Sequence, residues 1–310
     1  GKYLEKGDFN NDNYEDLVFT SAYWPGGGTN GEQGKAWILF GSKFLNNYYN
    51  LGESHWDITG FDGQVSNTFM AFASVGDING DGIDDLILAR AKPESSRPIT
   101  DLVHSTFLSS VFINYGPIAL GKNYYIDEYP KQTKIFSIGE SSFSGIESKL
   151  GQSMAIYDIN DDGYDDFLIG APGWTRTPSN WDDWRGSRTT EGAAFLFMGG
   201  ADLPDTMSVK HHAISKFLAW ETKNNPNYNI SFGKAVNIIK MNTNKIYATI
   251  ADNERSKIYF FNLDYNDCSP YNIETKALSN TKMIITWNSD CESITGYSLE
   301  RYSDNIWEKN

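Results

Sequence analysis

The chain has 310 residues, of which 40% are hydrophobic and 15% aromatic, a composition typical of a folded protein with a sizeable core. Its formal net charge of −14 at pH 7 argues against nucleic acid and against an anionic membrane surface as partners. Cys268 and Cys291 are its only cysteines, so a disulfide scaffold does not dominate the fold. No apolar run is long enough for a membrane-spanning helix, so no direct membrane insertion is expected.

An acidic segment occurs three times along the chain. The copies are GDFNNDNYEDLVFTSA at 7–22, GDINGDGIDDLILARA at 76–91 and YDINDDGYDDFLIGAP at 157–172. Each copy fits Asp-x-Asn-x-Asp-x-x-x-Asp and then enters a run of mainly apolar residues. A single acidic cluster is usually a solvated turn, but three copies with the same internal spacing indicate a structural repeat.

Four strands are predicted in each of three successive units, at about 1–61, 69–140 and 150–223. One apolar stretch precedes each acidic segment, one ends it, and two more follow. Aromatic and β-branched residues dominate these runs and Gly, Asn, Ser and Pro fill the gaps, which favours strands over helices. Four strands per repeat is the composition of a propeller blade. The runs outside the acidic segments are 1–8, 35–42, 55–61, 70–77, 109–116, 134–140, 151–158, 192–199 and 216–222.

A fourth unit, 232–264, keeps the strand pattern in a weaker form. Its first turn, KMNTNK at 240–245, contains no carboxylate, so we expect no cation there. The sequence changes character after Asp264, so the outer strand of this unit is expected to be missing.

The acidic segments have the composition of a calcium loop. Positions 1, 3, 5 and 9 offer side-chain oxygens and position 7 can offer a backbone carbonyl, which are ligands that Ca²⁺ prefers. Position 6 is Gly82 in the second copy and Gly163 in the third, where a tight loop needs φ > 0, and Asn13 replaces Gly in the first. No His or Lys stands inside the loops as a general base, so the sites are predicted to be structural.

An EF-hand is the main alternative for such a loop. It requires a bidentate Glu at position 12, before a helix. The three copies have Phe19, Leu88 and Ile169 there, each inside an apolar, strand-like run. The EF-hand interpretation is therefore excluded.

Two short motifs accompany the acidic loops. Gly170-Ala171-Pro172 follows the third loop, and Phe232-Gly233 begins the fourth unit. With the loops, these motifs resemble the FG-GAP repeats of integrin α-subunit β-propellers and related extracellular proteins. The resemblance covers roughly residues 1–264. Degenerate forms of the two motifs occur at Leu150-Gly151, Phe69-Met70, Ala89-Arg90-Ala91 and Thr20-Ser21-Ala22.

The resemblance implies that each acidic loop joins the first two strands of a blade and carries Ca²⁺. The residues at position 8 are Glu15, Asp84 and Asp165. They are expected to face solvent or to support the loop through contacts that do not involve the cation directly. The implied ligands, with the carbonyl oxygen at position 7, are Asp8, Asn10, Asp12, Tyr14 and Asp16; Asp77, Asn79, Asp81, Ile83 and Asp85; and Asp158, Asn160, Asp162, Tyr164 and Asp166.

The predicted fold is all-β: four four-stranded propeller units over 1–264, followed by a partial β-sandwich over 265–310. FG-GAP propellers commonly have seven blades, and a strand from the beginning of the propeller completes the last one. We therefore expect the four units to belong to a larger, seven-bladed propeller. The alternative is that four blades close on themselves.

The last segment, 265–310, resembles the first half of a fibronectin type III domain. Trp287 is then expected to be the core tryptophan of its second strand, and Tyr297 to belong to the third. Cys268 and Cys291 flank the first two strands, and both the paired and the unpaired state are open.

Two loops are candidates for binding a partner, because the propeller resemblance puts them on the face opposite the calcium loops. The first is 173–192, which is rich in Trp and Arg, and the second is 23–34, which contains Trp24. Trp and Arg are enriched at binding hot spots. The alternative is that the tryptophans fold the longer loop onto itself. His211 and His212 are expected to be exposed rather than to bind a metal. The candidate ligand-binding residues are Trp24, Trp174, Arg176, Trp181, Trp184 and Arg185.

The sequence therefore favours a calcium-stabilised, extracellular or cell-surface binding module without catalytic residues, which presents loops to a protein or glycan. One alternative is a non-catalytic accessory propeller of a secreted enzyme, such as a phospholipase D-like enzyme or a hydrolase. A purely architectural spacer is the other.

Overall fold

In the computed structural model, the described residues form 21 strands and one helix of four residues. The prediction of an all-β fold is confirmed. The chain divides into two compact units, Gly1–Leu263 and Asp264–Asn310. The structure describes residues 3–21, 34–49, 58–62, 70–90, 110–126, 128–136, 148–174, 192–218, 231–241, 245–253, 256–263, 271–279, 282–288, 300–303 and 306–309.

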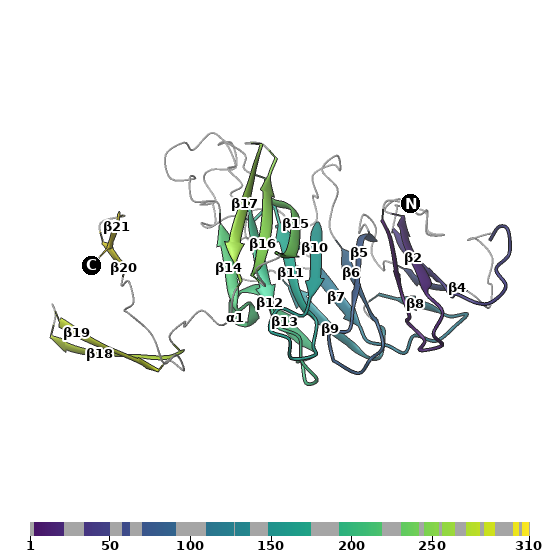
Figure 1. Cartoon of the computed structure of the whole chain (residues 1–310), viewed down its shortest axis with the longest axis horizontal. Helices are drawn as coiled ribbons and strands as arrows, with labels where there is room; N and C mark the ends of the chain where they lie inside the picture. The colour runs from purple at the N-terminus through teal and green to yellow at the C-terminus, as the bar shows by residue number, and fades with distance from the viewer. Residues whose placement is uncertain are drawn as a thin grey trace. The chain divides into compact units, whose positions relative to one another are not determined.

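The first three sheets share an antiparallel core of four strands that follow one another along the chain (Figure 1). Each core matches one predicted unit, because the short apolar runs between Gly- and Asn-rich turns pair with their nearest neighbours. The first sheet contains β1 (Leu4–Gly7), β2 (Asp16–Ser21), β3 (Lys35–Leu39) and β4 (Ile58–Asp62). The second contains β5 (Met70–Gly76), β6 (Asp85–Arg90), β7 (Ser110–Asn114) and β9 (Gln132–Phe136). The third contains β10 (Ser153–Tyr157), β11 (Asp166–Ala171), β12 (Ala193–Phe197) and β14 (Ser215–Leu218).

Two short strands that the sequence did not predict link neighbouring sheets. Strand β8 (Asn123–Tyr125) lies between β7 and β9 in the chain but pairs in parallel with β4 of the first sheet. Strand β13 (Thr206–Ser208) lies between β12 and β14 and pairs in the same way with β9 of the second sheet. The second and third units thus each add a strand to the outer edge of the sheet before them.

The helix α1 (Val209–His212) follows β13 directly. His211 and His212 are exposed, as predicted, and His212 Nδ1 accepts a hydrogen bond from Ser208 N at 3.1 Å.

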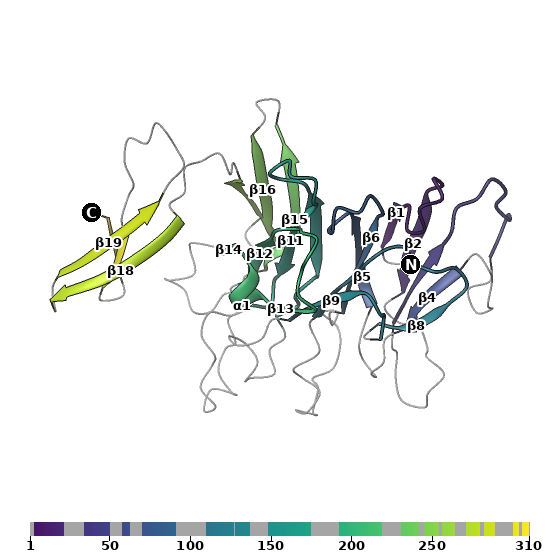
Figure 2. The ribbon, with the colours of Figure 1, turned by 90° about the horizontal axis from the view of Figure 1, so that it is seen from below.

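The fourth sheet has three strands among the described residues, β15 (Phe232–Lys240), β16 (Ile246–Asp252) and β17 (Lys257–Asn262). Residues 264–270, which follow β17, lie outside the described residues, so the absence of an outer strand from this unit stays a prediction. Figure 2 shows the four sheets in chain order, from the sheet of β1 and β2 at one end to the sheet of β15 and β16 at the other.

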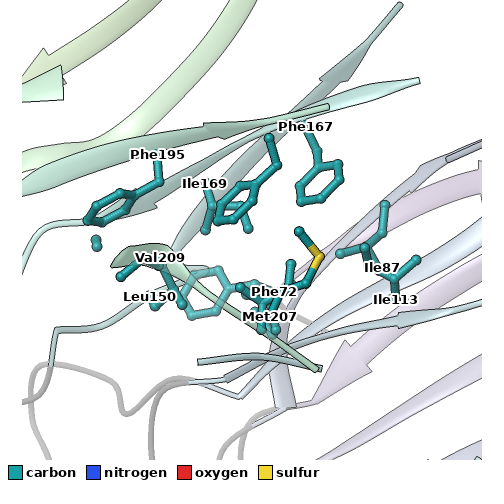
Figure 3. Close-up of a cluster of buried hydrophobic side chains, with 14 of the residues drawn as sticks. Phe72, Ile87, Ile113, Leu150, Phe167, Ile169, Phe195, Met207 and Val209 are labelled. Carbon is teal, nitrogen blue, oxygen red and sulfur yellow. The ribbon is translucent and has the colours of Figure 1, made fainter. Parts of the chain in front are cut away.

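Buried apolar side chains lie between each pair of consecutive sheets. Between the second and third sheets, Ile87 and Ile113 pack with Phe167, Ile169 and Phe195 in one cluster (Figure 3). The first strand of a sheet is central to these contacts: β5 packs against β1, β2 and β10, and β15 packs against β10 and β11. Burial of these faces supplies most of the driving force for stacking.

The glycine motifs lie where consecutive sheets approach most closely. Gly233 has φ +86°, and a Cβ there would collide with the carbonyl oxygen of Ala193. A Cβ on Gly170 would collide in turn with the carbonyl oxygen of Gly233, which accepts a hydrogen bond from Ser153 Oγ at 2.9 Å. The Phe-Gly motif of the fourth unit therefore contacts the Gly-Ala-Pro motif of the third, and both need glycine for that contact.

The second compact unit contains two hairpins among its described residues. They are β18 (Tyr271–Ser279) with β19 (Lys282–Asn288), and β20 (Glu300–Ser303) with β21 (Ile306–Lys309). Trp287 belongs to β19, whereas Tyr297, Cys268 and Cys291 lie outside the described residues. Its relationship to fibronectin type III domains stays a prediction.

Candidate metal sites

Each acidic segment forms the turn between the first two strands of its sheet. The ladders end at Gly7↔Asp16, Gly76↔Asp85 and Tyr157↔Asp166, so position 9 is always the first residue of the second strand. Position 12 lies within that strand in all three copies, which agrees with the exclusion of an EF-hand.

The second loop illustrates how these turns are held. Asp77 Oδ1 accepts a hydrogen bond from Asp81 N at 3.0 Å, and Asp77 Oδ2 accepts one from Gly82 N at 2.8 Å. Asn79 Oδ1 also accepts from Asp81 N, and Asp81 Oδ1 accepts from Ile83 N at 3.0 Å. The first and third loops make the same four bonds at 2.8–3.2 Å. The backbone of each loop thus curves around the side-chain oxygens of positions 1, 3 and 5.

Position 6 has a positive φ in every loop, as predicted. The angle is 82° at Gly82, 87° at Gly163 and 65° at Asn13. Position 4 shares this conformation, which the sequence did not predict: the residues there are Gly80, Asn11 and Asp161, with φ of 69°, 61° and 55°. Gly, Asn and Asp are the residues that tolerate this region best.

The position 9 carboxylates are buried and bind two backbone amides each. Asp85 is 0% exposed; its Oδ2 accepts from Ile78 N at 3.0 Å and its Oδ1 accepts from Gly116 N at 2.9 Å. Asp16 and Asp166 make the corresponding pairs of bonds at 2.7–2.9 Å. Each of these residues therefore joins its loop to the chain that follows the third strand of the same sheet.

Burial makes the charged form of these carboxyls costly. It raises the pKa of Asp85 from 3.8 to about 7, although hydrogen bonds from the backbone amides of Gly116 and Ile78 lower this pKa. The pKa of Asp16 and that of Asp166 are raised to about 6 for the same reason. Nearby aspartates in each loop add to the increase, and a cation bound there would counteract it.

The ligand types in each loop fit a hard cation. Carboxylate, amide and carbonyl oxygens occur within nine residues of each loop. A carboxylate oxygen that accepts one hydrogen bond from a backbone amide still has a lone pair for a cation. Among the described residues, however, no three His, Cys, Asp or Glu side chains converge as a ready-made metal cluster. Hydrogen bonds from backbone amides to side-chain oxygens thus shape the loops, and the ligand role of positions 1, 3, 5, 7 and 9 stays a prediction.

Position 8 has a role that sequence analysis left open. Asp84 Oδ2 accepts a hydrogen bond from Asp8 N at 2.7 Å, so it contacts the loop of the preceding sheet. Asp165 Oδ2 accepts from Asp77 N at 2.9 Å in the same way. Glu15 is exposed and instead pairs with Lys6, whose Nζ lies 2.6 Å from its Oε2.

The prediction that Trp174 belongs to a ligand-binding surface is wrong. Its side chain is 1% exposed and lies in the core, edge-on to Phe195 at a centroid distance of 6.3 Å. Lys216 Nζ lies over the indole, 4.7 Å from the ring centroid. Gly192 N donates to Trp174 O at 2.9 Å, so the start and the end of this loop are joined. Trp24, Arg176, Trp181, Trp184 and Arg185 lie outside the described residues.

Comparison with known proteins identifies one repeat. A protein-family model described as an FG-GAP repeat matches residues 150–195, which include the third acidic loop and the Gly-Ala-Pro motif. No curated protein matches the chain. In the described part of the chain, no helix has the length and hydropathy needed to span a bilayer. FG-GAP repeats are typically non-catalytic binding modules of propeller type, and they occur in extracellular or surface proteins. The chain therefore contains an FG-GAP repeat at residues 150–195.

Proposed function

We propose that this chain is a calcium-stabilised binding or adhesion module of an extracellular or cell-surface protein. The observation that carries the proposal is the recurrence of one loop geometry in three consecutive sheets, within a chain that contains an FG-GAP repeat. Three loops of the same shape and ligand composition are expected to share one function.

The ligands of each cation are the side-chain oxygens of positions 1, 3, 5 and 9 with the carbonyl of position 7. A bound cation supplies the positive charge that these clustered carboxylates need. Extracellular calcium modules have dissociation constants of about 10⁻⁴–10⁻³ M. Each site then adds only about 0.4–1.4 kcal/mol of stability at 1 mM Ca²⁺. The cations are therefore structural supports of the hairpins.

The partner, a protein or a glycan, is assigned to the loops at the other ends of the strands. Antiparallel pairing sends the turns between first and second strands to one end of each sheet, and the connections between second and third strands to the other. Trp174 and Gly192 form a fixed base for the longest of these connections. The Trp and Arg residues between them supply the contact chemistry.

The calcium assignment is tested by isothermal titration calorimetry on protein stripped with EDTA. The wild-type chain is expected to bind three Ca²⁺ ions, and Asp77→Ala two. Asp202→Ala, an exposed aspartate outside the loops, is the control and is expected to bind three. A wild-type chain that binds no calcium would contradict the proposal.

The partner surface is tested by glycan-array and pull-down screens with Trp181→Ala and Trp184→Ala. Loss of a wild-type ligand in either variant supports the assignment. Tyr48→Ala, which removes an aromatic side chain that is 84% exposed on a different connection, is the control. Binding that survives both tryptophan substitutions would remove this loop as the contact.

A further inference from the structure

Consecutive acidic loops contact one another through a pair of hydrogen bonds. Asp84, at position 8 of the second loop, accepts from Asp8 N through Oδ2 at 2.7 Å. The backbone N of Asp84 donates to the carbonyl oxygen of Asp8 at 3.3 Å. Both polar groups of the Asp8 backbone are therefore held by one residue of the next loop.

The same contact joins the second loop to the third. Asp165 Oδ2 accepts from Asp77 N at 2.9 Å, and Asp165 N donates to Asp77 O at 2.9 Å. Asp8 and Asp77 both occupy position 1, the first expected cation ligand of their loops. We call these two bond pairs, Asp84–Asp8 and Asp165–Asp77, the loop-to-loop contacts.

The residue before position 1 makes room for these contacts. A Cβ on Gly7 would lie 2.6 Å from Val75 Cγ1 and 2.8 Å from Asp84 Oδ2. A Cβ on Gly76 would collide with Ile156 Cγ2 and would lie 2.7 Å from Asp165 Oδ2. The third loop has Tyr157 at this place, and the matching turn of the fourth unit, 240–245, contains no carboxylate. Glycine thus occupies this place where the next unit supplies both an apolar side chain and a carboxylate, and a tyrosine occupies it where the next unit supplies no carboxylate.

A backbone hydrogen bond links the first loop, and another the second loop, to the next sheet at a second point. Ile118 N donates to Phe9 O at 2.7 Å, and Gly200 N donates to Ile78 O at 2.9 Å. The chain that provides Ile118 begins at Gly116, whose N is bound by Asp85 at position 9 of the second loop. Positions 8 and 9 of the second loop are therefore both connected to the first loop.

We infer that Asp84 and Asp165 are positioning residues that couple cation binding in neighbouring loops. This inference rests on the proposed calcium sites. Position 8 lies between the position 7 carbonyl and the position 9 carboxylate, so a cation that fixes those two ligands also fixes the carboxylate between them. The preceding loop then has its position 1 backbone ordered before its own cation binds, which strengthens that binding.

Calcium calorimetry on the whole chain, stripped with EDTA, tests the coupling. The wild-type protein is expected to bind three ions with positive cooperativity. Asp84→Ala is expected to weaken one site at least fivefold, the lower end of typical coupling factors, and to reduce the Hill coefficient. Asp84→Asn keeps an acceptor oxygen and is expected to restore part of the affinity. Glu15→Ala is the matched control, because Glu15 occupies position 8 but pairs with Lys6.

The outcomes separate the inference from the proposal that it deepens. A merely structural Asp84 would lower the melting temperature in EDTA but leave the site affinities and the Hill coefficient unchanged. That result, with three ions bound to the wild-type protein, would overturn the coupling and leave the calcium sites intact. Absence of calcium binding in the wild-type protein would overturn both.

Discussion

At the scale of single residues, the aspartate at position 9 has the most demanding environment. Asp85 is 0% exposed, and each of its oxygens accepts one backbone amide, from Ile78 or from Gly116. The same arrangement at Asp16 and Asp166 means that three buried carboxylates connect the acidic loops to the rest of their sheets.

Asp85→Asn is expected to destabilise the calcium-free protein. An asparagine has only one acceptor oxygen, so its NH₂ group would face either Ile78 N or Gly116 N and leave a buried donor unpaired. Such a loss costs about 1–3 kcal/mol in the free energy of unfolding. Urea denaturation in EDTA measures it, with Asp202→Asn as the exposed control. Equal stability of the two variants would contradict the structural role of Asp85.

The stability of the calcium-free protein is expected to fall as the pH rises from about 4 to about 7. Burial raises the pKa of Asp85 to about 7 and that of Asp16 and Asp166 to about 6 in the folded state, whereas all three titrate near 3.8 when unfolded. In this window the folded chain binds more protons, so deprotonation favours unfolding. Melting in EDTA across this range measures the slope. Asp85→Asn is expected to reduce the slope of melting temperature against pH. An identical slope in the variant and in the wild-type protein would show that Asp85 does not cause this pH dependence.

At the scale of elements, consecutive sheets pack through one repeated face. Leu168 pairs with Leu196 in the third sheet, and Thr249 pairs with Phe260 at the same place in the fourth. Leu196 is 0% exposed because the fourth sheet covers it, whereas Phe260 is 57% exposed. Equivalent strand positions therefore differ in burial according to whether a further sheet follows.

Leu196→Ala and Phe260→Ala form a matched pair that tests this packing. Truncation of the buried leucine is expected to lower the free energy of unfolding by about 2–5 kcal/mol. Truncation of the exposed phenylalanine is expected to change it by less than about 1 kcal/mol, the range of strand propensity. Urea titrations measure both. A loss of more than about 1 kcal/mol for Phe260→Ala would mean that another surface covers the outer face of the fourth sheet in solution.

The approach of the fourth sheet to the third makes a second prediction at this scale. Gly233→Ala places a Cβ against the Ala193 carbonyl at φ +86°, a strain that costs about 1–3 kcal/mol or more. Gly200→Ala is the control, because the nearest atom, Leu203 Cδ2, lies 4.0 Å from the added Cβ. Thermal melting of both variants measures the difference. Similar melting temperatures would argue against the close contact.

Local features of the fold could be predicted from the sequence, whereas contacts between units could not. The strands and the acidic turns follow from patterns within about 15 residues, so the hairpin at 76–91 was predictable. The pairing of β8 with β4 and the bond from Asp84 to Asp8 join residues more than 60 positions apart, which no local pattern encodes. Trp174 was misassigned because composition alone does not show where the core ends and a loop begins.

At the largest scale, the first unit is a row of four sheets, and the first three carry the acidic loops. The carboxylates in these loops repel one another, and those at position 9 are buried as well. Loop-to-loop contacts connect the three acidic loops in series. If the loops bind cations as proposed, removal of the cations is expected to weaken the packing of several sheets rather than one hairpin.

Thermal unfolding of the wild-type chain in EDTA and in 1 mM CaCl₂ measures how much calcium stabilises the fold. Three sites of the expected affinity add about 1–4 kcal/mol of stability together. For a unit of this size, that corresponds to a rise of roughly 3–15 °C in melting temperature. Magnesium at the same concentration is expected to produce a smaller rise, because it demands a more rigid geometry. Identical melting curves with EDTA and with calcium would contradict the account.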